Sequence, residues 1–274
     1  MRKKEEAVNY KANGIDISRG ENTPNNFMFR LHNHEDYEIY LFISGDAVYN
    51  IEGRIYQLHP YDMLFVRPDE MHRVCHNSEK CIYKRMVINV NDEFFEKFNI
   101  GDYKKTLIAR SMSEDRKIRG SAVIESGMRE ICDRIHKLIN TDKNAEPVID
   151  ALVVQLLYMM CNVDFIDRET PRDSKIQSAI DYINEHFTED ISLDIISKNT
   201  FVSKHHLCRI FKQTTGYTVG EYINHKRLMQ ASFLCKNKGM SLREACAESG
   251  FSNYSVFYRA YRKENGASPR EGMK

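Results

Sequence analysis

The chain has 274 residues, of which 42% are hydrophobic, and its formal net charge at pH 7 is +1. A chain of this length can hold two domains. Its apolar runs are far shorter than the roughly 18 residues that a membrane helix needs, and the charged residues 1–6 are unlike a signal peptide.

The cysteines and the charges indicate a compartment and a kind of partner. The seven cysteines are scattered and include no Cys-x-x-Cys pair, which favours reduced thiols in the cytoplasm over disulfides or a zinc finger. From Arg172 onward there are 16 Lys and Arg and 11 Asp and Glu, a net charge of +5, whereas 24 and 28 precede it, a net charge of −4. We therefore expect the C-terminal part to bind a phosphate-rich partner.

Short strands are predicted over residues 27–90. Aromatic and β-branched side chains fill residues 37–43, 46–51 and 63–66, and turns with Gly, Pro and Asp separate these segments. Strands of this length at such regular spacing predict a β-sandwich or barrel. Residues 92–105 predict a polar helix or loop after it.

Histidines and a glutamate recur among these strands in an ordered pattern. His32 and His34 are followed by Glu38, and His72 comes later. This pattern resembles the first motif of the cupin jelly roll, and the resemblance implies that these four residues hold a metal ion. Alternation along one strand would point the first three to the same side.

Three roles for this cluster remain open. Neutral imidazoles and a carboxylate suit zinc, iron, nickel or manganese, so the first is a transition-metal site. In the second, the same side chains and Tyr40 line the pocket of an organic effector, for example a sugar. In the third they mainly hold the fold. Asp62 stands where cupins have glycine, which argues against the metal.

Two amphipathic helices are predicted after the strands. Apolar residues at helical spacing extend over residues 121–140, and a second such stretch begins at Pro147. The hairpin, placed at residues 119–165, has a wide apolar surface that needs a partner. That partner is a second copy of the chain, giving a homodimer, or the barrel itself. A short polar linker is predicted at residues 166–174.

Residues 191–269 contain the same pattern twice. Leu207 and Phe257 lie fifty positions apart, whereas Leu193 and Leu242 lie forty-nine apart, so the second copy has one extra residue, expected in its turn near Gly250. Each copy predicts two short helices joined by a tight turn. Such a repeat is a stronger signal than either copy alone.

The second helix of each copy, predicted at residues 203–213 and 252–263, has a polar and basic outward face. Arg pairs with guanine, Asn with adenine and Ser with bases or phosphates, so the face fits a recognition helix in the major groove of DNA. A basic face on one short helix is often merely solvated, but two copies in register favour DNA. The candidate DNA-binding residues are Ser203, Lys204, His205, Arg209, Lys212, Ser252, Asn253, Ser255, Arg259, Arg262 and Lys263. We assign to base edges His205, Arg209, Asn253 and Arg259, and to phosphates Lys204, Lys212, Arg262 and Lys263.

Residues 176–269 resemble the AraC/XylS-type transcription regulators, which carry two helix-turn-helix units. The matching residues include Ile180-Asp181-Tyr182-Ile183, Ser192-Leu193, Ser203, Leu207, Arg209, Phe211-Lys212, Gly216, Tyr222-Ile223, Arg227-Leu228, Ala231, Gly250-Phe251, Phe257, Arg259, Gly266 and Ser268-Pro269. The cupin-like part precedes them in the order usual for that family, whose N-terminal domain senses a small molecule and whose helical hairpin forms dimers. This sequence departs from the family pattern at Ser197, Ala245-Cys246 and Gly272. Ala245-Cys246 gives the core of the second helix-turn-helix unit smaller side chains.

The sequence therefore predicts an α+β protein of two domains. Residues 1–118 form a cupin-like β jelly roll that senses an effector and is followed by the hairpin, and residues 175–274 form an all-α DNA-binding domain. We expect a cytoplasmic, sequence-specific transcription regulator, not an enzyme. Its partners would be promoter DNA, a small-molecule effector, a second copy, and RNA polymerase if it is an activator. The alternatives are a metal-dependent cupin enzyme with a DNA-binding tail and a sensor that acts through protein partners.

Overall fold

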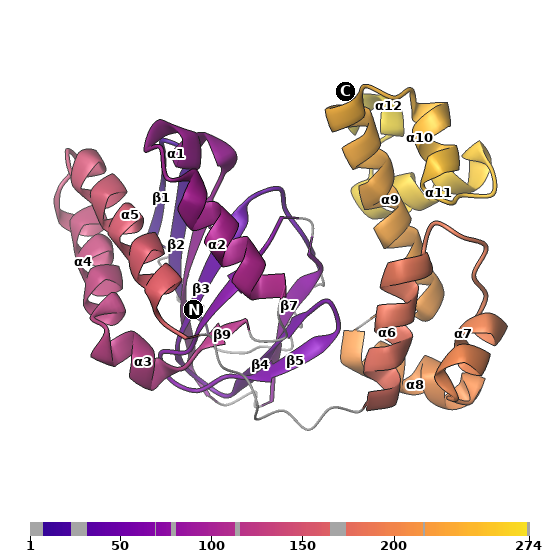
Figure 1. Cartoon of the computed structure of the whole chain (residues 1–274), viewed down its shortest axis with the longest axis horizontal. Helices are drawn as coiled ribbons and strands as arrows, with labels where there is room; N and C mark the ends of the chain where they lie inside the picture. Colours follow the sequence, from indigo (N-terminus) through magenta and orange to yellow (C-terminus); the bar gives the residue numbers. More distant parts are fainter. Residues whose placement is uncertain are drawn as a thin grey trace, which may run out of the picture. The chain divides into compact units, whose positions relative to one another are not determined.

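The computed structural model describes residues 8–22, 32–68, 70–77, 81–112, 116–164, 174–215 and 217–272. The chain divides into two compact units, Met1–Thr170 and Pro171–Lys274 (Figure 1). The first unit contains all the described strands, and the second is helical, as the sequence predicts. Nearly all of the predicted linker at residues 166–174, and Gly216 of the repeat, lie outside the described residues. No helix in the described parts is long and apolar enough to cross a membrane.

Two antiparallel sheets build the first unit. The larger sheet has the strand order β1-β2-β8-β3-β6-β9, and the smaller has the order β5-β4-β7. The bounds of the strands are β1 Val8–Ala12, β2 Ile15–Asn22, β3 Tyr37–Ser44, β4 Ala47–Ile51, β5 Arg54–Gln57, β6 Met63–Val66, β7 His72–His76, β8 Tyr83–Val90 and β9 Lys117–Ile118.

The larger sheet is buried on both faces. Alternate residues of β3 point in opposite directions, so Ile39 and Leu41 pack in one apolar cluster while Tyr40 and Phe42 pack in another with the smaller sheet. This double burial explains why β3 reads as a continuous apolar run instead of an alternating one. The second cluster contains the candidate effector residue Tyr40, and it also contains Tyr49, whose hydroxyl donates a hydrogen bond to the candidate residue Glu38.

Five helices follow the strands or lie between them. Their bounds are α1 Asp92–Lys97, α2 Gly101–Met112, α3 Gly120–Glu125, α4 Met128–Thr141 and α5 Glu146–Asn162. The single helix predicted at residues 121–140 is wrong, because Gly127 takes a left-handed conformation with φ 83° and separates α3 from α4. The second helix of the hairpin begins where the sequence predicts, with Pro147 in its first turn.

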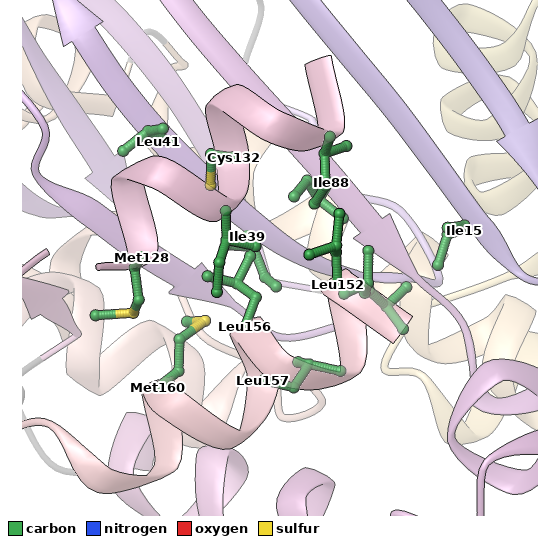
Figure 2. Close-up of a cluster of buried hydrophobic side chains, with 14 of the residues drawn as sticks. Ile15, Ile39, Leu41, Ile88, Met128, Cys132, Leu152, Leu156, Leu157 and Met160 are labelled. Carbon is green, nitrogen blue, oxygen red and sulfur yellow. The ribbon is translucent and has the colours of Figure 1, made fainter. Parts of the chain in front are cut away.

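The hairpin of α4 and α5 packs its apolar face on the larger sheet (Figure 2). Leu152, Leu156 and Met160 of α5 and Met128 of α4 share one buried cluster with Ile39 of β3. The larger sheet of the first unit is therefore a partner for the apolar face of the hairpin, which is one of the two partners that the sequence allowed. The homodimer stays a prediction.

The second unit is a bundle of seven helices within the described range. Their bounds are α6 Ser174–His186, α7 Leu193–Thr200, α8 Lys204–Thr215, α9 Val219–Lys238, α10 Leu242–Glu248, α11 Tyr254–Asn265 and α12 Pro269–Gly272. The pairs α7–α8 and α10–α11 are the two copies of the repeat, and the long α9 connects them.

The turns of the two copies locate the extra residue. Each turn contains one residue in the left-handed conformation, Phe201 with φ 55° in the first copy and Gly250 with φ 87° in the second. These two residues lie forty-nine positions apart, as do Leu193 and Leu242, at which the first helices of the two copies begin. The second helices, α8 and α11, begin fifty positions apart. The added residue therefore comes after Gly250, just before α11, and this helix starts two residues later than the predicted 252.

Candidate DNA-binding surface and effector site

Each copy of the repeat buries one face of its second helix and exposes the other. Leu207 and Phe211 of α8, like Phe257 and Tyr261 of α11, pack inward. The eleven predicted DNA-binding residues are all exposed. Spacing of three to four residues produces this division, because it returns side chains to the same side of a helix.

Ser252 and Asn253 do not lie on the recognition helix, contrary to the prediction. Asn253 is the N-cap of α11, and its Oδ1 accepts a hydrogen bond from the Val256 backbone N at 3.0 Å. A bidentate contact with adenine needs this oxygen and the amide nitrogen together. The predicted adenine contact would therefore break the cap, and Asn253 is better described as the residue that starts α11.

Two of the lysines assigned to phosphates have acidic partners within the second unit. Lys204 pairs with Asp194 of α7, and the Lys263 Nζ lies 3.0 Å from Glu221 Oε1 of α9. The lysine side chains remain 52% and 75% exposed, so water screens both pairs. A phosphate oxygen can replace such a partner at small cost.

Tyr258 is a further candidate DNA-binding residue, which the residue types alone did not reveal. The offset of fifty positions places it at the same point of α11 as Cys208 on α8, and the next residues, Arg259 and Arg209, correspond in the same way. Cys208 is exposed and Tyr258 is half-buried. Carrying the offset through every position of the helix would have found this residue from the sequence.

In the first unit, three of the four predicted ligands converge. The ligand atoms of His34, Glu38 and His72 all lie within 4.8 Å of one another. The His34 Nε2 lies 3.1 Å from Glu38 Oε2, and the His72 Nε2 lies 3.6 Å from the same oxygen. The prediction of one strand through His32, His34 and Glu38 is wrong, because β3 begins only at Tyr37.

His32 takes a different position from the other three. Its backbone pairs with that of His72 in an isolated bridge, with N–O distances of 3.1 and 2.9 Å. Its ring centroid lies 4.4 Å from that of His72 and 6.2 Å from that of His34. It is therefore a neighbour of the cluster and not a member of it.

Backbone carbonyls fix the orientation of both imidazoles in the cluster. The His34 Nδ1 lies 2.9 Å from the Asp36 carbonyl oxygen, and the His72 Nδ1 lies 2.8 Å from the Glu70 carbonyl oxygen. A carbonyl only accepts, so each Nδ1 donates and each Nε2 of a neutral ring presents a lone pair to Glu38. The buried His72 Nε2 makes no hydrogen bond to any described residue.

This arrangement favours a positive charge at the point where the three side chains meet. Burial alone would raise the pKa of Glu38, but the neighbouring imidazoles of His34 and His72 hold it well below its usual range. Burial would lower the pKa of His34, but Glu38 raises it. Tyr49 also donates a hydrogen bond to Glu38 Oε1. An ionised carboxylate facing two lone pairs requires a proton or a cation between them, and the residues therefore fit a metal ion.

Tyr40 lies in the inner core beside this cluster. Its side chain is 1% exposed, its hydroxyl is hydrogen-bonded to that of Tyr83, and its ring centroid lies 4.4 Å from that of Tyr49. Burial raises the pKa of Tyr40 well above its ordinary value, so its hydroxyl stays neutral. Either hydroxyl of this pair can be the donor.

A β-rich unit with a polar cluster, followed by a double helix-turn-helix unit, defines a ligand-responsive DNA-binding regulator. Residues 14–157 match the family model described as AraC-like ligand binding domain, and residues 196–274 match the one described as helix-turn-helix domain. The chain belongs to the AraC family of transcription regulators, as the sequence resemblance implied.

Relatives of known role match along both units. The chain is 23% identical over 244 residues to the HTH-type transcriptional activator RhaS of Klebsiella pneumoniae (strain 342), covering 89% of this chain and 87% of the relative. It is 23% identical over 255 residues to RhaS of Salmonella arizonae, with the same coverage. Among solved structures it is similar to ToxT from Vibrio cholerae, with 13% identity, a TM-score of 0.37, and coverage of 95% of this chain and 98% of that one.

Proposed function

We propose that this AraC-family regulator couples the state of the cluster around Glu38 to binding of promoter DNA by α8 and α11. The observation that carries the proposal is the repeat, because two recognition helices with basic outward faces occur at equivalent positions. They would enter successive segments of the major groove, about 34 Å apart on one face of the duplex.

Equivalent residues of the two helices are given the same roles. Arg209 and Arg259 lie at matching positions and would read base edges, together with His205. Lys212 and Arg262 also match and would hold phosphates, as would Lys204 and Lys263 after leaving their acidic partners. Ser203 and Ser255 lie near the helix starts, where backbone and side chain can both reach a phosphate.

Selection of bound duplexes from a random DNA library tests this function. The full chain should enrich two short motifs, and its affinity for them should fall steeply with salt as counterions are released. Binding of random duplexes with the same affinity as the enriched ones would refute sequence-specific regulation. It would favour a sensor that acts through protein partners.

For the sensor, His34, Glu38 and His72 are proposed as ligands of a transition-metal ion. Neutral imidazoles and one carboxylate suit zinc, iron, nickel or manganese, and such an ion would attract the oxygens of a hydroxyl-rich effector, for example a sugar. The support is the unsatisfied His72 Nε2, which points at an ionised carboxylate.

The metal content of the purified, untagged protein decides this part. About one transition ion per chain, absent from His72→Ala but retained by His59→Ala as a control outside the cluster, is the expected result. A metal-free wild-type protein would refute it and leave the cluster to bind the effector directly or to hold the fold. A screen of sugars for changes in DNA affinity would then follow.

The partners follow from the same function. The relatives are named transcriptional activators, which supports activation and a contact with RNA polymerase in the cytoplasm. For the homodimer, the support is that α5 leaves Val148 42% and Tyr158 52% exposed on a hairpin otherwise packed on the sheet. A single species of monomer mass at micromolar concentration, measured by light scattering, would refute the dimer.

A further inference from the structure

The two helix-turn-helix units meet at one short loop, residues 187–189, between α6 and α7. From one side, Arg227 of α9 grips the loop: its Nε donates to the Phe187 carbonyl at 2.6 Å, and its Nη2 donates to the Glu189 carbonyl at 2.7 Å. The guanidinium thus donates to two backbone oxygens at once. Its planar set of N–H donors is pre-organised, so little side-chain entropy is lost per hydrogen bond.

The turn between α10 and α11 packs against the same loop. A Cβ added to Gly250 would lie only 2.4 Å from the Thr188 carbonyl oxygen. Gly250 also has φ 87°, a left-handed conformation that glycine tolerates best. Contact here is between one backbone and another, so the second turn cannot tilt without moving the loop.

The helix that carries Arg227 also holds the second recognition helix. His225 of α9 is hydrogen-bonded to the carboxylate of Glu264 of α11. The hydroxyl of Tyr222 donates to Asn184 of α6 at 3.2 Å. α9 therefore contacts α6 and the loop at residues 187–189 on the side of the first helix-turn-helix pair, and α11 in the second pair.

We infer that Arg227, the loop at residues 187–189 and Gly250 form a joint that sets the spacing between the two half-sites on DNA. The inference rests on the proposed entry of α8 and α11 into successive groove segments. Each base pair added between half-sites moves the second by about 3.4 Å and turns it by about 34° around the duplex. A joint held by backbone contacts cannot follow that turn, so it rejects the altered spacing.

Selection from a random duplex library measures this property directly, with the full chain throughout. Arg227→Lys keeps the charge, and so the attraction to phosphate, but a single ammonium group cannot replace the fork on two carbonyls. The half-site sequences should stay those of the wild type. Preference for the wild-type spacing over sites one base pair longer or shorter should fall roughly tenfold, as expected for losing a charged hydrogen bond. Arg243→Lys, on the exposed part of α10, is the matched control and should keep the wild-type spacing.

A second variant covers the case in which Arg227→Lys does not fold. Gly250→Ala places a methyl group against Thr188 and forces the joint open without touching a charge. A folded variant of either kind that keeps the wild-type preference for spacing overturns the inference. A wild-type protein that enriches no paired half-sites overturns the proposed function, and this inference with it.

Discussion

Replacing Arg209 by alanine tests the role of α8 in reading bases. The side chain is exposed, and its Nη2 lies 3.4 Å from His206 Nδ1, a long contact whose loss on binding DNA costs little. The substitution also removes the proposed bidentate pair with a base edge. Arg209→Ala should lose roughly 1–3 kcal/mol on the preferred site, which is about 5- to 150-fold in Kd.

Fluorescence anisotropy at one salt concentration would compare three duplexes: the preferred site, a site changed at one base pair, and a random sequence. Arg209→Ala should weaken binding to the preferred site and relax the preference at the changed base pair. The matched control is Lys212→Ala on the same face of α8, which should weaken binding to all three about equally. An equal loss on all three duplexes for Arg209→Ala would place the arginine on a phosphate and refute its role as a base reader.

Three further predictions concern the thiols, acid stability and the core. In a maleimide assay at pH 7.5, DNA should protect the exposed Cys208 on α8 from labelling but should not protect the exposed Cys81 of the first unit. Cys132 should stay unlabelled even without DNA, because it is buried and burial raises its pKa to about 12. Backbone and side-chain hydrogen bonds from Thr218, with the Lys263 pair, lower the pKa of Glu221 to about 2. A depressed carboxylate pKa stabilises the folded state above the unfolded pKa, so Glu221→Gln should cost at most about 1 kcal/mol at neutral pH. That difference should vanish as the pH falls from about 4 toward 2. Leu156→Ala removes a fully buried side chain under α5 and should lower the free energy of unfolding by about 2–5 kcal/mol in a urea melt.

Each of these has an outcome that contradicts it. Equal labelling of Cys208 with and without specific DNA would mean that α8 does not face the duplex. A Glu221→Gln difference that persists at pH 2 would mean that the carboxylate does not act through its charge. For Leu156→Ala, a loss below about 1 kcal/mol would show that α5 is not packed on the sheet, and Gln155→Ala on the same helix is the exposed control.

Local rules determined much of this protein from the sequence alone. Helical spacing placed α5, α8 and α11 within a few residues of their observed bounds, because the side that a helix buries repeats every three to four residues. The repeat revealed two equivalent units before any contact was known. Convergence of His34, Glu38 and His72 was also expected, although for a reason that proved wrong, since His34 precedes the strand.

Only the tertiary structure decided which neighbours these residues have. The His72 ring reaches Glu38 because β7 and β3 belong to sheets that face each other, and no local pattern fixes that distance. The same contacts separated His32 from the cluster and bound Arg227 to two carbonyls of a loop that lie thirty-eight and forty residues away in the sequence. Periodicity along the chain tells which side of an element is buried. It does not tell what that side is buried against, because that depends on residues brought together from distant parts of the sequence.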